Sequence, residues 1–126
     1  MSLRPGLTGR AALEVGEADT AVAMRSGDVP VLATPRLVAL CEEAACDALV
    51  GHLDAGHTTV GSSVQFNHLA PTAVGGSVTA EATLEKVEGR RLGFTVSASD
   101  PNGLVGAGRV TRVVVEAERF LKKVKE

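Results

Sequence analysis

The sequence predicts an α+β protein in which one helix lies across a curved antiparallel sheet. In residues 34–52, apolar side chains recur at steps of three and four, whereas the residues that follow alternate between apolar and polar. Turn sequences rich in Gly, Pro and Asn separate the alternating stretches. The chain has 126 residues and is 44% hydrophobic, so we expect residues 1–126 to form a single domain around one core.

The helix is expected within the segment TPRLVALCEEAACDALVGH. Thr34 is a suitable N-cap, Pro35 fits the first helical position, and Gly51 stands just past the end. The apolar face consists largely of small residues, so another element can pack closely against it. Its members are Leu37, Leu40, Cys41, Ala44, Ala45, Ala48 and Leu49.

Four strands are expected after the helix and one before it. The first lies in GSSVQFNHLAPTAVGG and places Val64, Phe66 and His68 on one face. The next two carry the inward rows Val78, Ala80, Ala82, Leu84 and Leu92, Phe94, Val96, Ala98. The turn DPNG precedes the last, LVGAGRVTRVVVE. The preceding strand is expected within RAALEVGEADTAVAM, and the lysine-rich end is expected to be a solvated tail.

Composition and charge argue against several classes of partner. The net charge is −2 with scattered basic residues, and Trp and Tyr are absent, so neither nucleic acid nor an anionic membrane is expected. No apolar run is long enough for a signal peptide or a membrane span. Cys41 and Cys46 lie roughly 140° apart around the predicted helix and cannot bridge each other. Free, partly buried thiols fit a reducing compartment, so we expect a cytoplasmic protein.

His68 is the first candidate functional residue. It continues the inward row of its strand, yet histidine is the side chain best suited to proton transfer near neutral pH. A hydrogen-bonded core histidine would fit the same position, so the strand alone leaves both interpretations open.

The predicted helix carries two adjacent acids that helical geometry separates. At about 100° per residue, Glu42 falls at the margin of the apolar face and Glu43 lies nearly opposite to that face. A carboxylate beside Val, Ala and Cys side chains loses hydration, which makes it a better base or nucleophile than a solvated acid. Glu42 is therefore a candidate catalytic residue, with a marginal glutamate that reaches solvent as the alternative.

Four residues in register resemble a known family. Thr34, Glu42, Gly61 and His68, with ATP before the helix and VEGRR between strands, resemble the hot-dog-fold acyl-CoA thioesterases similar to fluoroacetyl-CoA thioesterase. The resemblance runs without gaps over residues 31–100. It implies a hot-dog fold, hydrolysis of an acyl-CoA thioester without a cofactor, and a homodimer whose site lies between the subunits.

The resemblance also implies a role for each of these residues. Glu42 would attack the thioester or activate water, and His68 would act as general base and assist the departing thiolate. Thr34 would hold the carboxylate or substrate, and Gly61 would lie beside the bound thioester, where backbone N–H groups could face the carbonyl oxygen. Thr34 could instead serve only as a helix cap, and Gly61 only to permit close backbone approach.

Substrate recognition is suggested by two further features. Arg90 and Arg91 are candidate ligands for the CoA phosphates, because guanidinium pairs well with phosphate, although they could equally be surface charges of a hairpin. The segment TAVAMRSGDVPVLAT contains no aromatic residue, where fluoroacetyl-CoA thioesterase has an aromatic-rich lid. We therefore expect a small acyl-CoA as substrate, without selectivity for the fluoroacetyl group.

Other functions fit parts of the sequence less well. Asp47 and His52 have the spacing of a hot-dog hydratase motif but lack its flanking Asn-Pro. A non-catalytic acyl-CoA-binding module would keep the fold and the pocket without turnover. The spacing of His52, His57 and His68 matches no ligand motif, so no metal site is expected.

Overall fold

The computed structural model describes residues 2–125, and most of them belong to one sheet and one long helix. The sheet contains β1 (Thr8–Glu14), β2 (His57–His68), β3 (Ser77–Glu88), β4 (Arg91–Asp100) and β5 (Gly103–Glu116). The helical elements are η1 (Glu17–Asp19), α1 (Thr34–Ala48) and α2 (Ala117–Lys125).

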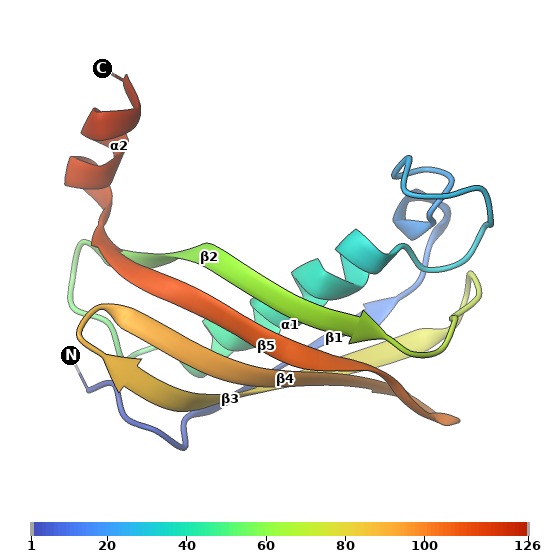
Figure 1. The fold of residues 1–126 in the computed structure, drawn as a ribbon, viewed down its shortest axis with the longest axis horizontal. Helices are drawn as coiled ribbons and strands as arrows, with labels where there is room; N and C mark the ends of the chain where they lie inside the picture. The colour runs from blue at the N-terminus through green and yellow to red at the C-terminus, as the bar shows by residue number, and fades with distance from the viewer. Residues whose placement is uncertain (1, 126) are drawn as a thin grey trace.

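The five strands pair antiparallel in the order β1-β3-β4-β5-β2. The sheet curls around α1, so that the helix lies along its inner face (Figure 1). One strand precedes the helix and four follow it, as the alternation and turn sequences predict. The predicted α+β arrangement of one helix against a curved antiparallel sheet is therefore confirmed.

The core lies between α1 and the inner face of the sheet. Both predicted inward rows of β3 and β4 are buried, and so is every predicted member of the apolar helix face. Aromatic residues contribute little, because Phe94 is the one aromatic side chain in the fully buried set of the described residues. Small residues allow very close packing instead: a Cβ atom at Gly9 of β1 would overlap the backbone of Ala44 and Ala48.

The start of α1 differs from the prediction. The N-cap position is occupied by Ala33 and has no side-chain hydrogen bond, so Thr34 is not the cap. Thr34 is the first helical residue, and its hydroxyl group is hydrogen bonded to His68. The other end agrees with the sequence, since Gly51 adopts φ +80° just past the helix.

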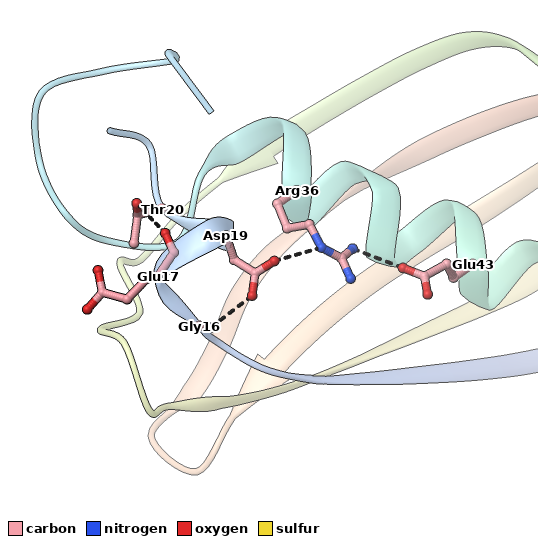
Figure 2. Close-up of polar contacts among 6 residues, drawn as sticks. All are labelled: Gly16, Glu17, Asp19, Thr20, Arg36 and Glu43. Carbon is pink, nitrogen blue, oxygen red and sulfur yellow. Dashed lines mark hydrogen bonds and ion pairs between the residues drawn. The ribbon is translucent and has the colours of Figure 1, made fainter. Parts of the chain in front are cut away.

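Residues 20–33, called the lid segment below, connect η1 to α1 and are fastened to the helix by charge. The Arg36 Nε atom donates to Asp19 Oδ1 at 3.2 Å, and Arg36 Nη1 donates to Glu43 Oε2 at 2.9 Å (Figure 2). The second Asp19 oxygen accepts from the Gly16 amide, and the Asp19 carbonyl accepts from the Ala33 amide. Asp19 therefore connects both ends of this segment to the first turns of α1.

β2 forms one edge of the sheet, where none of the described residues pairs with its outer side. Val64 was expected in the inward row with Phe66, but it is 42% exposed because an edge strand is covered on one side only. The register shifts between Gly61 and Ser63, so β2 also contains a bulge. The chain ends in α2, a helix without buried residues, where only a solvated tail was expected.

Candidate active site

Thr34 and His68 are brought together from different elements. Thr34 begins α1 and His68 ends β2, and the Thr34 Oγ1 and His68 Nδ1 atoms are 2.8 Å apart. The other ring nitrogen, Nε2, is buried and has no hydrogen-bond partner among the described residues. A buried polar atom of this kind requires an explanation, and a role toward substrate provides one.

This pair lines a small pocket at the base of the lid segment. The pocket has a volume of about 300 Å³. Its wall combines the catalytic candidates with small and apolar residues from the lid and from the turn after β2. The lining residues are Ala21, Ser26, Val31, Leu32, Thr34, His68, Leu69, Ala70 and Pro71.

Glu42 and Gly61 form a second cluster together with a residue that we did not predict. Arg112 of β5 donates from Nη1 to Glu42 Oε2 at 3.1 Å, and from Nε and Nη2 to the hydroxyl and carbonyl oxygens of Thr59. A Cβ atom at Gly61 would lie 2.7 Å from the same Glu42 oxygen, so any side chain at this position would displace the Glu42 carboxylate. The Glu42 side chain is 32% exposed, which fits its predicted place at the margin of the helix face.

Sequence reasoning missed Arg112, although a signal was present. The buried face of β5 carries Val110, Arg112 and Val114 in alternation, so the sequence places an arginine inside an apolar row. A buried guanidinium requires a partner, and the carboxylate at the edge of the facing helix was the available one. The ion pair with Arg112 fixes the position of the Glu42 carboxylate.

The two clusters are separated within one protomer. Thr34 and Glu42 are eight residues apart on α1, which is about 12 Å along the helix axis. No hydrogen bond joins Glu42 to His68 or Thr34 among the contacts of the described residues. A single chain therefore presents two separate clusters, a histidine with a hydroxyl group and a carboxylate with an arginine.

The two cysteines differ in their surroundings. Cys41 is buried, and the loss of hydration together with the neighbouring Glu42 charge raises the pKa of its thiol to about 11. Cys46 is exposed, so the expectation of partial burial is wrong for this residue. It lies on the outer side of α1 because it is five positions from Cys41.

Arg90 and Arg91 do not join either cluster. They lie in the hairpin between β3 and β4, at the end of the sheet opposite His68 (Figure 1). Both are exposed, and Arg91 pairs in register with Val113 of β5. A role toward the phosphates of CoA remains a prediction for these residues.

The residues of the competing functions are not brought together. Asp47 Oδ2 accepts from the Arg10 amide of β1, whereas His52 Nδ1 is hydrogen bonded to the Ser2 hydroxyl. His57 is the first residue of β2, at the opposite end from His68. Among residues 2–125 there is no group of three or more His, Cys, Asp or Glu side chains suited to hold a metal ion.

The fold agrees with comparisons to known proteins. The solved structure of fluoroacetyl-CoA thioesterase FlK matches with a TM-score of 0.93 and 31% identity, covering 99% of this chain and 97% of that one. A hot-dog-like protein from Thermanaerovibrio acidaminovorans matches with a TM-score of 0.88 and 31% identity, covering 97% of this chain and 90% of that one. The curled sheet around a long helix is therefore the hot-dog fold, as the resemblance implied.

The sequence comparisons identify the family. A fluoroacetyl-CoA thioesterase from Streptantibioticus cattleyicolor is 38% identical over 96 residues, which are 76% of this chain and 69% of that protein. The family model of the fluoroacetyl-CoA-specific thioesterase matches residues 15–118. The chain belongs to this thioesterase family, so the expected enzyme class, a thioester hydrolase acting on acyl-CoA, is confirmed. No helix in the described part of the chain has the length and apolar character needed to cross a membrane.

Proposed function

We propose that this enzyme hydrolyses small acyl-CoA thioesters with Thr34, Glu42 and His68 as its catalytic residues. The observation that carries the proposal is the state of His68, whose Nδ1 is held by the Thr34 hydroxyl while Nε2 is buried without a partner. When Nδ1 carries the proton and donates to Thr34 Oγ1, Nε2 is free to accept a proton. This is the arrangement that a general base requires.

In the proposed reaction, His68 Nε2 accepts a proton from water as the water oxygen attacks the thioester carbonyl carbon. The C–S bond then breaks, and the proton passes from His68 to the departing sulfur, so the products are the free acid and CoA. Glu42 either activates the same water or attacks the carbonyl carbon itself. In the second case it forms an anhydride that water then hydrolyses. Backbone N–H groups near Gly61 or the start of α1 would stabilise the oxyanion.

We propose further that the enzyme is a homodimer whose site lies between the subunits. Two observations support this assembly. Thr34 and Glu42, which mark the two clusters that we interpret as half-sites, are about 12 Å apart along α1, and no other described strand pairs with the outer edge of the 12-residue β2. Long unpaired edges invite pairing with another strand. Two β2 strands that pair antiparallel around a two-fold axis would complete the sheet and bring unlike half-sites together.

The position of the axis follows from the half-sites. An antiparallel pair centred on Val64 would place His68 opposite the partner's Val60, which is adjacent to the partner's Gly61. Val64 is an exposed apolar residue in the middle of this edge, so burial at the axis would stabilise the dimer. Each site would then combine the histidine half of one subunit with the carboxylate half of the other.

The lid segment supports a substrate without fluoroacetyl selectivity. Ala21, Ser26 and Val31 form its side of the pocket, and no aromatic ring lies in this segment. We propose that a small acyl group is accepted on the basis of size. We also propose that residues 1–126 act as one domain, and that the enzyme works in the cytoplasm, where two free thiols are compatible with the reducing conditions.

We propose that Arg90 and Arg91 contribute to binding of the CoA phosphates. They are exposed in a hairpin at the end of the sheet where β2 begins. In the proposed dimer this end receives the partner's His68, so a CoA moiety that extends out of that site would pass near the hairpin. Replacing both arginines by glutamine should raise KM for acyl-CoA and leave kcat unchanged.

The test is release of thiol from a panel of acyl-CoAs, including acetyl-CoA and fluoroacetyl-CoA, followed with a thiol-reactive dye. His68→Ala should lower the rate on the order of 10²–10⁴-fold, because a general base is lost. His57→Ala is the matched control, since this histidine lies at the other end of the same strand and should leave the rate unchanged. A loss below tenfold in His68→Ala would assign this residue to packing.

A second measurement separates catalysis from binding. If acyl-CoA raised the melting temperature while no panel member released thiol, the protein would be a non-catalytic acyl-CoA-binding module. A preference for fluoroacetyl-CoA over acetyl-CoA would contradict the proposed lack of selectivity without affecting the assignment of the catalytic residues.

A further inference from the structure

Two groups of exposed apolar side chains lie at opposite ends of β2. The first, called the α2 patch, consists of Phe120, Leu121 and Val124, which are 37%, 52% and 69% exposed. The second, called the lid patch, consists of Val22, Met24 and Val29, which are 51%, 39% and 58% exposed. Exposed apolar groups of this kind on a small protein indicate surfaces that are covered by a partner.

The α2 patch is not used within its own protomer. α2 buries none of its side chains, and its hydrophobic residues stand on one side of a helix whose other residues are strongly charged. A nine-residue amphipathic helix is marginal in water unless its apolar face is packed against something. α2 therefore presents an apolar side that its own protomer leaves exposed.

The lid segment offers such a surface. Beside the lid patch lies an apolar hollow of about 420 Å³, which is lined by Glu17, Ala18, Thr20, Val22, Ala23 and Pro30. Glu17 is the one ionisable residue in this lining, whereas α2 carries Arg119, Lys122, Lys123 and Lys125 against the single acid Glu118. The apolar side chains of α2 would therefore meet an apolar hollow, and its basic residues would lie near the one acidic residue of the lining, Glu17.

The geometry of one chain prevents this contact from forming within it. β2 has 12 residues and is about 40 Å long, and α2 and the lid segment both extend beyond its edge at opposite ends (Figure 1). A two-fold axis near the middle of β2 exchanges the ends of the strand, so α2 of one subunit reaches the lid end of the other.

We propose that α2 of each subunit docks on the lid segment of its partner, with the α2 patch in the apolar hollow. This inference rests on the proposed homodimer and names a second contact within it. The lid segment also supplies Ala21, Ser26 and Val31 to the pocket of Thr34 and His68. The docked helix would therefore hold the wall of the partner's acyl pocket in place, and the C-terminal helix becomes part of the substrate-binding structure.

Chemical cross-linking between two differently tagged, co-expressed chains tests this contact. Both chains carry Cys46→Ser, so that buried Cys41 is the one remaining native cysteine. One chain carries Val22→Cys, the other carries Val124→Cys, and a short flexible bismaleimide is added. We expect a covalent heterodimer from this combination, and none from Val22→Cys with Val22→Cys or from Val124→Cys with Val124→Cys. Like positions lie about 40 Å apart, at opposite ends of the paired strands.

A substitution that weakens the contact completes the test. Leu121→Asp should reduce the cross-linking yield several-fold, and it does not threaten the fold because α2 buries nothing in its own protomer. Leu104→Asp is the matched control, since Leu104 is 50% exposed and lies at the start of β5, far from α2 in its own protomer. It should leave the yield unchanged.

Sedimentation equilibrium of the same proteins distinguishes the two proposals. A dimer that cross-links through unlike positions supports the docked helix. A dimer that yields no heterodimeric cross-link, or that yields cross-links equally from like positions, overturns the proposed docking but still supports the proposed dimer. A monomer overturns both.

Discussion

The carboxylate of Glu42 is held in place by Arg112, whose Nη1 atom lies 3.1 Å from Glu42 Oε2. The guanidinium is 91% buried and is fixed on its other side by two hydrogen bonds to Thr59, so it has little freedom to move. The catalytic role that we propose for this carboxylate requires a defined position more than a strong attraction. The β5 arginine provides that position from across the helix–sheet interface.

Replacing Arg112 by methionine should therefore reduce both activity and stability. Glu42 would remain at the margin of the core without its arginine partner, so the free energy of unfolding should fall by about 1–3 kcal/mol. This loss is smaller than for a fully buried ion pair, because the Glu42 side chain reaches solvent. Urea unfolding and thiol release measure the two effects. Arg109→Met is the control, since Arg109 is an exposed residue of the same strand, and an equal loss in both variants would contradict a specific role for Arg112.

Thr34 offers a test of the hydroxyl contact with His68. Thr34→Ser keeps the hydroxyl group and should retain most of the activity, whereas Thr34→Val should lower kcat at least tenfold because His68 Nδ1 loses its partner. The free energy of unfolding should change by less than about 0.5 kcal/mol in either variant, since the helix cap is Ala33. A large loss of stability with unchanged kcat would return Thr34 to a structural role.

A side chain at Gly61 is expected to displace Glu42. In Gly61→Ala the new methyl group would lie 2.7 Å from Glu42 Oε2, so the carboxylate must move and kcat should fall by tenfold or more. Gly93→Ala of β4 is the matched strand control, because its Cβ would make an ordinary 3.6 Å contact with Lys86. Rates of thiol release that are equal in the two variants would show that the position of Glu42 is not critical.

The link from Asp19 through Arg36 to Glu43 should restrain the lid segment. Arg36→Gln removes both ion pairs, which we expect to stabilise the closed position of the lid segment by about 1 kcal/mol in total. The open form should therefore be roughly fivefold more populated, and trypsin should cleave after exposed Arg25 faster by the same factor. Mass spectrometry of the fragments gives the rate. Arg10→Gln, which loses only a 3.8 Å contact with exposed Glu81, should leave this cleavage unchanged.

The two cysteines should differ in reactivity and in their effect at alkaline pH. Cys46 should react with iodoacetamide in the native protein, and Cys41 only after unfolding. Burial raises the pKa of Cys41 from 9.0 to about 11, so above pH 9 the unfolded chain releases this proton first. The free energy of unfolding should therefore decrease between pH 9 and about 11, and it should decrease less in Cys41→Ala. Equal pH dependence would argue against the raised pKa.

The sequence predicted the elements whose burial follows a regular period. The inward rows of β3 and β4 and the small-residue face of α1 are local patterns, so they could be identified without tertiary information. The helix α2 was overlooked because its apolar residues occupy only one turn and pack against nothing in the chain. Val64 was expected to point inward and is instead exposed. The alternating pattern alone does not indicate which strand lies at an edge of the sheet.

The same distinction applies to the site. His68 and Glu42 were candidates from their places in the strand and helix patterns, and the resemblance added Thr34 and Gly61. The fold then places the four residues in two pairs. Arg112 was not found, because its partner is 70 residues away in sequence and only the packing of α1 against the sheet brings them together. The helix cap was assigned to Thr34 from residue type, which cannot reveal that a histidine competes for the hydroxyl group.

The contact of Gly9 with the backbone of α1 has a consequence for the length of acyl chain that fits. Helix and sheet touch so closely along β1 that not even one methyl group can be inserted between Gly9 and Ala44 or Ala48. A growing hydrocarbon tail therefore cannot extend toward that side of the interior. In the proposed site, the length of the acyl chain that fits is therefore set on the opposite side, by the lid segment and the β2 edge. The β1 side keeps the distance between α1 and the sheet constant.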